Sequence, residues 1–219
     1  TIFGTFIDSS DILHLVMEYL DGRSLESYLR DHPVLPTEAL LRICLQIMAG
    51  MIYLESQGIV HRDMAARNVL VSSDLKAIKV SDFGLATALE STYYNGSKEK
   101  PLPVKWCAPE VIKRRRYSSK SDVWSLGVTF WEVFSQGARP FSAMTNTEAF
   151  EFVEVGNRLK KPAGCPLEMY ELMLKCWEKD YEKRPSFEKI QNGISKILSQ
   201  KVKNQGTGPD SDVYEDFKM

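Results

Sequence analysis

The clearest periodic pattern lies between Thr37 and Gly58. Apolar side chains recur there every three or four residues: Leu41, Cys44, Leu45, Met48, Met51 and Ile52. This spacing predicts an amphipathic helix, and Gly58 can end it because glycine adopts left-handed backbone angles at little cost. A second stretch, Ser119–Gln136, carries apolar side chains on nearly every face. A helix of that kind belongs in the middle of a domain.

Shorter elements are predicted before, between and after these two helices. The apolar runs Ile2–Ile7 and Ile12–Glu18 flank a turn-forming cluster at 8–11, so we expect a β-hairpin. The other predicted elements are helices near 24–30, 145–155, 166–177 and 186–198 and strands near 69–71 and 76–80. The polar stretch from Lys201 onward has too few apolar residues to be buried, which predicts disorder.

The composition is that of a soluble globular domain, with 43% hydrophobic and 26% charged residues. A net charge of −1 argues against a nucleic-acid or membrane-surface protein. No uninterrupted apolar run approaches the roughly 18 residues of a spanning helix, so we expect no membrane span. The cysteines (Cys44, Cys107, Cys165 and Cys176) lack metal-site spacing, which favours free thiols and a cytoplasmic location.

Most of the charged residues without periodicity lie between the two long helices. The segment 61–68 (HRDMAARN) precedes the short strand at 69–71, and a second short strand leads to Asp82. Asp63, Asn68 and Asp82 are therefore expected at the ends of two adjacent strands. Their oxygens suit Mg²⁺ bound together with phosphates, and one carboxylate is left to accept a proton from an alcohol.

These motifs, in this order, resemble those of the protein kinases: HRDMAARN, DFG (82–84), APE (108–110), SDVWSLG (121–127) and CW…RP (176–185). The resemblance covers residues 1–198 and implies an α+β protein-kinase-like fold. Its mainly α-helical C-lobe would span 24–198, after a remnant β-hairpin of the N-lobe at 1–18 and a hinge at 19–23. Residues 199–219 would then be a disordered tail.

The resemblance implies catalytic roles in the 61–68 segment. Asp63 would accept the proton of the substrate hydroxyl, with Arg67 and Asn68 beside it as catalytic residues. Asn68 and Asp82 would hold the Mg²⁺ ions that bridge the ATP phosphates.

The resemblance also implies an ATP-binding surface, formed by Met17, Glu18, Tyr19, Leu20, Leu70 and Asp82. Met17 corresponds to the gatekeeper, residues 18–20 to the hinge whose backbone bonds the adenine, and Leu70 to the floor beneath it.

A further set of residues is structural in the family: His61, Arg62, Phe83, Gly84, Glu110, Asp122 and Arg184. We expect Glu110 to pair with Arg184 in the interior, and Asp122 to hold the backbone at 61–62. Asp122 also fits a capping box begun by Ser119, and this alternative stays open.

Two features favour a tyrosine substrate over serine or threonine. Ala65 stands where serine/threonine kinases usually carry a lysine, and Arg67 precedes Asn68, as in tyrosine kinases. Pro103 would form a platform for a flat phenol ring. The predicted function is transfer of the ATP γ-phosphate to tyrosines of protein substrates, and the subfamily looks closest to spleen tyrosine kinase, with the Janus kinases second.

Three tyrosines are candidate phosphorylation sites. Tyr93 and Tyr94 lie between the DFG and APE motifs and are predicted to be regulatory, with phosphate pairing with Arg62. Tyr214, in an acidic surrounding, is a candidate docking site for an SH2 domain, although an inert tail is an equal alternative.

The glycine-rich phosphate loop of the family and its ATP-anchoring lysine have no counterpart in residues 1–219. We therefore expect these residues to represent a kinase fragment that transfers phosphate poorly by itself. A truncated kinase-like scaffold or decoy is the alternative, but the presence of Asp63, Asn68 and Asp82 favours an enzyme.

Overall fold

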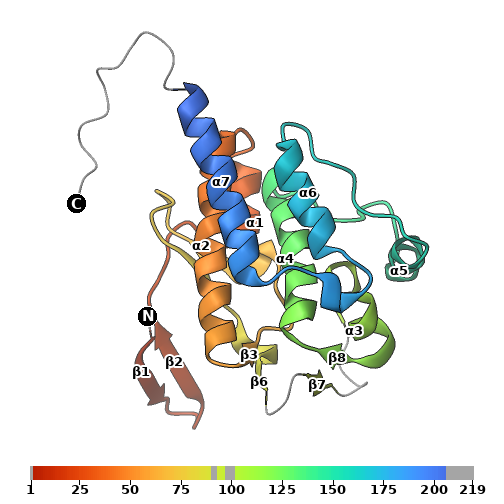
Figure 1. The fold of residues 1–219 in the computed structure, drawn as a ribbon. Helices are drawn as coiled ribbons and strands as arrows, with labels where there is room; N and C mark the ends of the chain where they lie inside the picture. Colours follow the sequence, from red (N-terminus) through yellow and green to blue (C-terminus); the bar gives the residue numbers. More distant parts are fainter. Residues whose placement is uncertain (1, 90–92, 97–101, 206–219) are drawn as a thin grey trace, which may run out of the picture.

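The computed structural model in Figure 1 describes residues 2–89, 93–96 and 102–205. Its helices are α1 (Leu25–Asp31), α2 (Thr37–Ser56), α3 (Pro109–Arg114), α4 (Ser119–Phe134), α5 (Asn146–Glu154), α6 (Leu167–Cys176) and α7 (Phe187–Gln205). Its strands form antiparallel pairs: β1 (Ile2–Ile7) with β2 (Leu13–Met17), β3 (Ile59–Val60) with β6 (Thr87–Ala88), β4 (Val69–Val71) with β5 (Ile78–Val80), and β7 (Tyr94–Asn95) with β8 (Arg116–Tyr117). The predicted α+β, mainly helical fold is confirmed.

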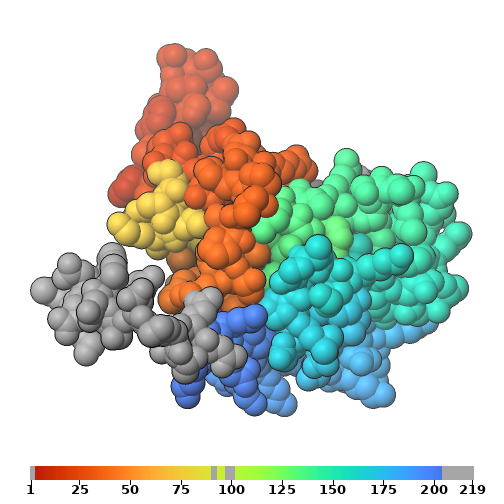
Figure 2. Space-filling view, turned by 90° about the horizontal axis from the view of Figure 1, so that it is seen from above, coloured from red at the N-terminus to blue at the C-terminus, as the bar shows by residue number. Residues whose placement is uncertain are grey.

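The β1–β2 hairpin projects from the helical body, as Figures 1 and 2 show. Its turn is closed by Asp8, whose Oδ1 accepts hydrogen bonds from the main-chain N–H groups of Ser10 (2.8 Å) and Ile12 (3.1 Å). Asp11 adopts φ +61°, a left-handed angle that Asp tolerates better than most residues. These turn residues produce the hairpin that the apolar runs predicted.

The long amphipathic helix α2 forms one wall of the core. It packs against α4, α7 and β5, and its residues Cys44 and Met48 are fully buried. Its end is marked by Gly58 at φ +65°, as predicted. By length and composition alone α2 could cross a membrane, although it is not an uninterrupted apolar run. Its packing instead explains its composition, because the same apolar residues form the protein core.

Helix α4 occupies the centre of the fold and is buried on nearly all sides (Figure 1). It packs against α2 and α6, and Leu126, Phe130 and Val133 are fully buried. The helix begins after Ser118, whose N–H donates to Ser121 Oγ (3.0 Å). The capping-box alternative beginning at Ser119 is therefore wrong.

The C-terminal helix is longer than its sequence pattern predicted. Helix α7 continues to Gln205, so residues 199–205 are helical rather than disordered. The apolar face of α7 ends near Leu198, and the last turns continue beyond it as a polar helix. The rest of the tail, including Tyr214, lies outside the described residues.

The thiols of Cys44, Cys107, Cys165 and Cys176 are free and buried, as expected. Burial raises the pKa of Cys107, Cys165 and Cys176 to about 12, so these thiols stay protonated and act as small apolar groups.

Candidate active site

The 61–68 loop is fixed to the central helix α4 by Asp122. Asp122 Oδ2 accepts a hydrogen bond from the main-chain N–H of His61 (2.7 Å), and Oδ1 accepts one from that of Arg62 (3.0 Å). Burial raises the pKa of Asp122 to about 6, although both hydrogen bonds act to lower it. Asp122 therefore determines where the loop begins, and Arg62 can adopt its left-handed φ of +72° there.

His61 connects the loop to the segment that follows β5. Its ring is buried, Nδ1 accepts the N–H of Asp63 (3.3 Å), and Nε2 then donates to the carbonyl oxygen of Ser81 (3.0 Å). The ring lies 5.5 Å from that of Phe83, with 55° between the ring planes. The two rings thus make a tilted contact.

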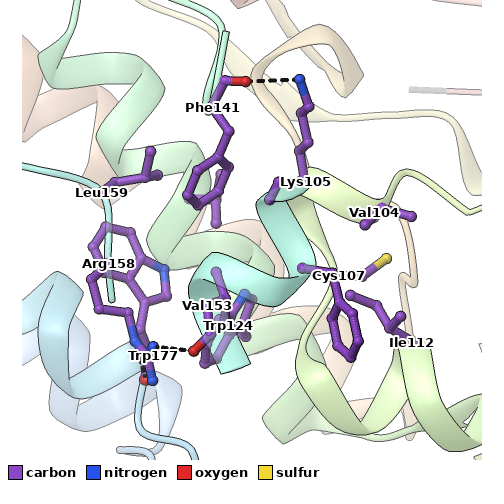
Figure 3. Close-up of a pocket in the computed structure, with 13 residues that line it drawn as sticks. Val104, Lys105, Cys107, Ile112, Trp124, Phe141, Val153, Arg158, Leu159 and Trp177 are labelled. Carbon is purple, nitrogen blue, oxygen red and sulfur yellow. Dashed lines mark hydrogen bonds between the residues drawn. The ribbon is translucent and has the colours of Figure 1, made fainter. Parts of the chain in front are cut away.

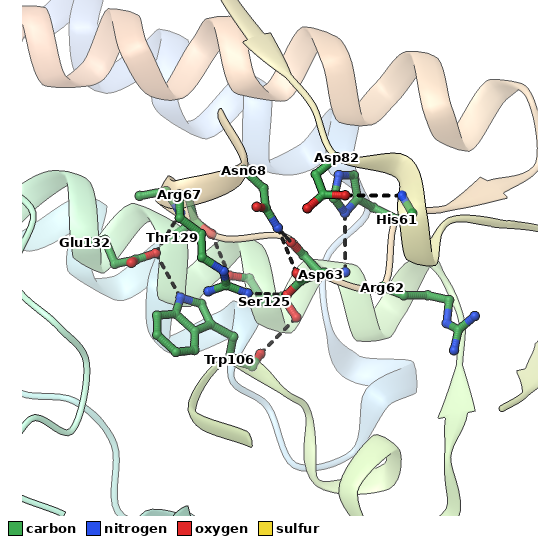
Figure 4. A network of polar contacts seen from close by, with 12 residues as sticks. His61, Arg62, Asp63, Arg67, Asn68, Asp82, Trp106, Ser125, Thr129 and Glu132 are labelled. Carbon is green, nitrogen blue, oxygen red and sulfur yellow. Dashed lines mark hydrogen bonds and ion pairs between the residues drawn. The ribbon is translucent and has the colours of Figure 1, made fainter. Parts of the chain in front are cut away.

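The Asp63 carboxylate is held on both sides by residues of the same loop (Figure 4). Arg67 forms an ion pair with Oδ1, and the Asn68 amide donates to Oδ2 (2.8 Å) and to the main-chain oxygen of Asp63 (2.7 Å). The carboxylate is largely buried, with 16% of the side chain exposed. Since Nδ2 of Asn68 faces Asp63, its amide oxygen is directed elsewhere and remains available to a ligand.

Asp82 reaches the same region through the register of β4 and β5. Val69 pairs with Val80, and the ladder extends to Ser81, whose N–H donates to the carbonyl oxygen of Asn68 (2.9 Å). The next residue, Asp82, is therefore adjacent to the residue that pairs with Asn68. It adopts φ +60°, its Oδ1 accepts the N–H of Gly84 (3.3 Å), and its side chain is exposed. The exposed carboxylate of Asp82 and the largely buried amide of Asn68 thus lie at the ends of two paired strands.

The predicted hinge, residues 19–23, is tied to the end of β4. The N–H of Gly22 donates to the Val71 carbonyl (3.0 Å), and the N–H of Val71 donates to that of Arg23 (3.0 Å). A bridge between Ser24 and Leu70 continues this pairing. The half-buried Leu70 therefore lies close to the hinge.

The remaining predicted ATP-binding residues differ in exposure. Met17 and Tyr19 are exposed, by 54% and 82%, whereas Leu20 is buried. The Glu18 side chain forms an ion pair with Lys79 on β5 (2.5 Å). Its side chain is therefore engaged elsewhere, and only the backbone of residues 18–20 is available for the predicted contact with adenine.

The 103–106 segment is connected to Asp63 through Arg67. Pro103 precedes a single 3₁₀ turn, and its carbonyl oxygen accepts the N–H of Trp106 (2.9 Å). The Arg67 guanidinium, which binds Asp63, also stacks over the Trp106 ring at 4.7 Å from its centroid. The predicted substrate platform and the predicted base are thus joined through one side chain.

Glu132 is a residue of this site that sequence reasoning missed. It lies on the apolar helix α4, is 2% exposed, and hydrogen-bonds to both the 61–68 loop and the 103–106 segment. Burial raises its pKa to about 7. A single acidic residue in the otherwise uncharged, mostly apolar stretch 126–134 was the signal that could have identified it.

The Glu110–Arg184 ion pair links the segment that follows 103–106 to the residues just before α7. The Arg184 guanidinium donates to both carboxylate oxygens of Glu110 (2.6 and 2.8 Å), and its side chain is fully buried. It also donates to the carbonyls of Glu178 (2.8 Å) and Lys120 (2.9 Å) and stacks over Trp124. This arrangement fixes the segment after 103–106 to the start of α7.

A compact apolar cavity lies behind the 103–106 segment (Figure 3). Lys105 crosses it, and its ammonium group donates to the carbonyls of Phe141 (2.8 Å) and Met144 (2.5 Å). The cavity is lined by none of the 61–68 residues and not by Asp82. It therefore supports the platform and is not the candidate nucleotide site.

Arginine side chains surround the two predicted regulatory tyrosines. Arg62 stacks on the rings of Tyr94 (4.7 Å) and Tyr117 (4.2 Å), and its buried Nε has no hydrogen-bond partner among the described residues. Arg116 stacks on the ring of Tyr93 at 4.2 Å. Both tyrosines are therefore next to cationic groups.

Comparison with known proteins shows the family of the chain. Residues 1–194 match the family described as protein tyrosine and serine/threonine kinase. The chain belongs to the protein kinase family. Kinase relatives include the megakaryocyte-associated tyrosine-protein kinase of Mus musculus, 48% identical over 85% of this chain. Tyrosine-protein kinase Fer of Rattus norvegicus is 41% identical over 84%, and the ephrin type-A receptor 5 of the same species is 42% identical over 90%.

The chain spans 36%, 22% and 21% of the lengths of these three kinases, respectively. All three are named as tyrosine-protein kinases or as a receptor, and none is a spleen or Janus kinase. The predicted subfamily therefore stays a prediction.

Proposed function

We propose that this chain is the catalytic part of a protein tyrosine kinase that transfers the γ-phosphate of ATP to tyrosine hydroxyls of protein substrates. The observation that carries the proposal is the Asp63 carboxylate, held by Arg67 and Asn68 next to the 103–106 segment. The tyrosine-kinase relatives at 41–48% identity support the same reading.

Asp63 is the proposed acceptor of the substrate proton. Its ion pair with Arg67 and its hydrogen bond from Asn68 fix the direction of the carboxylate. A substrate hydroxyl that donates to this carboxylate is oriented for attack on the γ-phosphate. General-base assistance of this kind contributes about 10²–10⁴-fold to a rate.

Asn68 and Asp82 are the proposed ligands of Mg²⁺. Both present oxygen atoms, both lie at strand ends connected by the Ser81–Asn68 hydrogen bonds, and Asp82 is exposed. This donor set fits Mg²⁺, which binds through one or two protein oxygens, substrate phosphates and water. When bound there, Mg²⁺ would neutralise charge on the ATP phosphates.

The nucleotide base is proposed to lie between the hinge and β4. The backbone of Glu18, Tyr19 and Leu20 would bond the adenine, Met17 would act as gatekeeper, and Leu70 would pack beneath the ring. The Ser24–Leu70 bridge supports this arrangement because it holds β4 against the hinge.

The preference for tyrosine is proposed to come from Ala65, Arg67 and Pro103. Ala65 supplies no cation to the phosphate, and Arg67 instead extends from Asp63 to the face of Trp106. A phenol ring lying on the Pro103 platform carries its hydroxyl farther from the backbone than serine does. The longer side chain therefore reaches Asp63.

Phosphorylation of Tyr93 and Tyr94 is the proposed regulation. A phosphate adds about −1.5 to −2 charges. On Tyr94 it would lie near the Arg62 guanidinium, whose Nε has no hydrogen-bond partner among the described residues. The change of both tyrosines to Phe is expected to abolish activation by prior phosphorylation, and unchanged activation would refute this regulation.

The remaining proposals concern location and partners. The free, buried cysteines favour a cytoplasmic location. One relative is named as a receptor, so a kinase segment within a larger receptor protein fits the cysteines equally well. Tyr214 remains a candidate SH2-docking site.

The test joins residues 1–219 to a kinase N-lobe that carries a glycine-rich loop and an ATP-anchoring lysine. With radiolabelled ATP, we expect the chimera to phosphorylate a tyrosine peptide but not its serine counterpart, and residues 1–219 alone to be far slower. Asp82→Asn should abolish transfer, whereas Asp74→Asn, which changes an exposed residue of the β4–β5 turn, should not.

Two outcomes would contradict the proposal. Equal labelling of the serine peptide would refute the tyrosine preference. A chimera that folds but transfers no phosphate would favour the scaffold alternative.

A further inference from the structure

A single buried carboxylate connects the two segments that the proposed reaction brings together. Glu132 Oε2 accepts the main-chain N–H of Ala66 in the 61–68 loop (2.9 Å) and the indole Nε1–H of Trp106 in the 103–106 segment (2.9 Å). Figure 4 shows the Glu132 carboxylate pointing at the Trp106 indole from α4. The two donors belong to segments about forty residues apart in sequence.

These hydrogen bonds close a ring of contacts around the site. Ala66 is followed by Arg67, whose guanidinium binds Asp63 and stacks on Trp106 at 4.7 Å. Trp106 in turn donates to Glu132, which holds Ala66. A displacement of the 103–106 segment would therefore move Glu132, Ala66 and Arg67 together.

Burial makes the Glu132 carboxylate depend on its two hydrogen bonds. Glu132 is 2% exposed and forms no ion pair among the described residues. A buried carboxylate is destabilising unless hydrogen bonds compensate it, and the two donors that compensate Glu132 come from the 61–68 loop and the 103–106 segment. The charged groups that influence it are Arg67 from the 61–68 loop, which favours ionisation, and Glu26 from α1, which opposes it.

From this geometry we infer that Glu132 is a positioning residue that couples the placement of the substrate platform to the placement of the catalytic loop. The terms catalytic loop and substrate platform rest on the proposed function. The coupling between the two segments is a property of the folded chain and does not depend on catalysis. An ionised Glu132 makes two charge-assisted hydrogen bonds, which are shorter and stronger than neutral ones. Protonation weakens both at once, because both donors share the same oxygen.

The test is a pH titration of residues 1–219 followed by ¹H–¹⁵N NMR. The Ala66 amide and the Trp106 indole signals are expected to shift with one shared midpoint near 7, where burial raises the pKa of Glu132. The indole of Trp131 is the matched control: it lies one residue before Glu132 but donates to the carbonyl of Lys160 (2.8 Å). Its signal should not follow that midpoint.

Variants separate coupling from simple burial. Glu132→Gln should remove the titration from both signals, and Trp106→Phe should shift the Ala66 amide although Trp106 does not touch it. Different midpoints for the two signals in the wild type, or an Ala66 amide unaffected by Trp106→Phe, would overturn the inference. The wild-type titration needs no phosphoryl transfer, so it distinguishes this inference from a failure of the proposed function.

Discussion

Replacing Glu110 by alanine removes one half of the buried ion pair and leaves the Arg184 guanidinium in the interior without its carboxylate. Arg184 is fully buried and donates two hydrogen bonds to Glu110 at 2.6 and 2.8 Å. An uncompensated buried charge of this kind costs about 3–5 kcal/mol of unfolding free energy. The carbonyls of Lys120 and Glu178 still accept from Arg184, which favours the lower half of that range.

The magnitude translates into a measurable change in melting temperature. For a domain of about 150–250 residues, 1 kcal/mol shifts Tm by roughly 2–4 °C. Glu110→Ala is therefore expected to lower Tm by roughly 6–16 °C in a circular-dichroism melt of residues 1–219. The Tm of Glu110→Gln should lie between those of the wild type and Glu110→Ala, because glutamine keeps one acceptor oxygen but loses the charge.

A surface ion pair provides the control. Glu38 and Arg42 lie four residues apart on α2, and their side chains are 31% and 59% exposed. Exposed pairs of this kind contribute at most about 1 kcal/mol, so Glu38→Ala should shift Tm by only a few degrees. If Glu110→Ala and Glu38→Ala lowered Tm equally, the argument from burial would be refuted.

Three further predictions follow from individual contacts. Asp122→Ala leaves two loop N–H groups unpaired, so urea unfolding should show a loss of about 2–6 kcal/mol, at about 1–3 kcal/mol per group; a loss below 1 kcal/mol would contradict the anchoring role. Gly22→Ala would bring a Cβ within 2.7 Å of the Val71 oxygen and should lower Tm, whereas Gly4→Ala, with nothing within 4 Å, should leave it nearly unchanged. The pKa of Glu132 is raised from 4.5 to about 7, so its stabilising contribution is fully present below pH 4.5 and is lost as pH rises through 7. Glu132→Gln should therefore reduce the fall in stability over that window by about 3 kcal/mol, measured by urea unfolding at several pH values.

The long elements were predictable because each has an unambiguous periodicity. The apolar period of 3.6 in α2 matches its packing against α4, α7 and β5. The apolar side chains on nearly every face of α4 match its burial in the centre of the fold. The hairpin followed from two apolar runs around Asp8, whose side chain closes the turn. The tail of α7 was mispredicted, because a polar helix that continues past its apolar face carries no periodic signal.

The site was predictable only as far as its motifs extend. The positions of Asp63, Asn68 and Asp82 came from motif order, and the register of β4 and β5 explains how strand pairing brings them together. The role of Glu132 could not be predicted, because it depends on two donors from distant segments meeting at one oxygen. The stacking of Arg62 on the rings of Tyr94 and Tyr117 could not be predicted either, although Arg62 itself was a predicted site residue.

The central claim is that Asp63 accepts the proton of a tyrosine hydroxyl during phosphoryl transfer. The most direct measurement is the single-turnover rate of the N-lobe chimera with Asp63 changed to Asn, at saturating ATP and tyrosine peptide. Asn keeps the shape and can still meet Arg67 and Asn68, so the fold should survive while the rate falls by about 10²–10⁴-fold. A folded Asp63→Asn protein that transfers phosphate within a factor of about two of the parent rate would contradict the account.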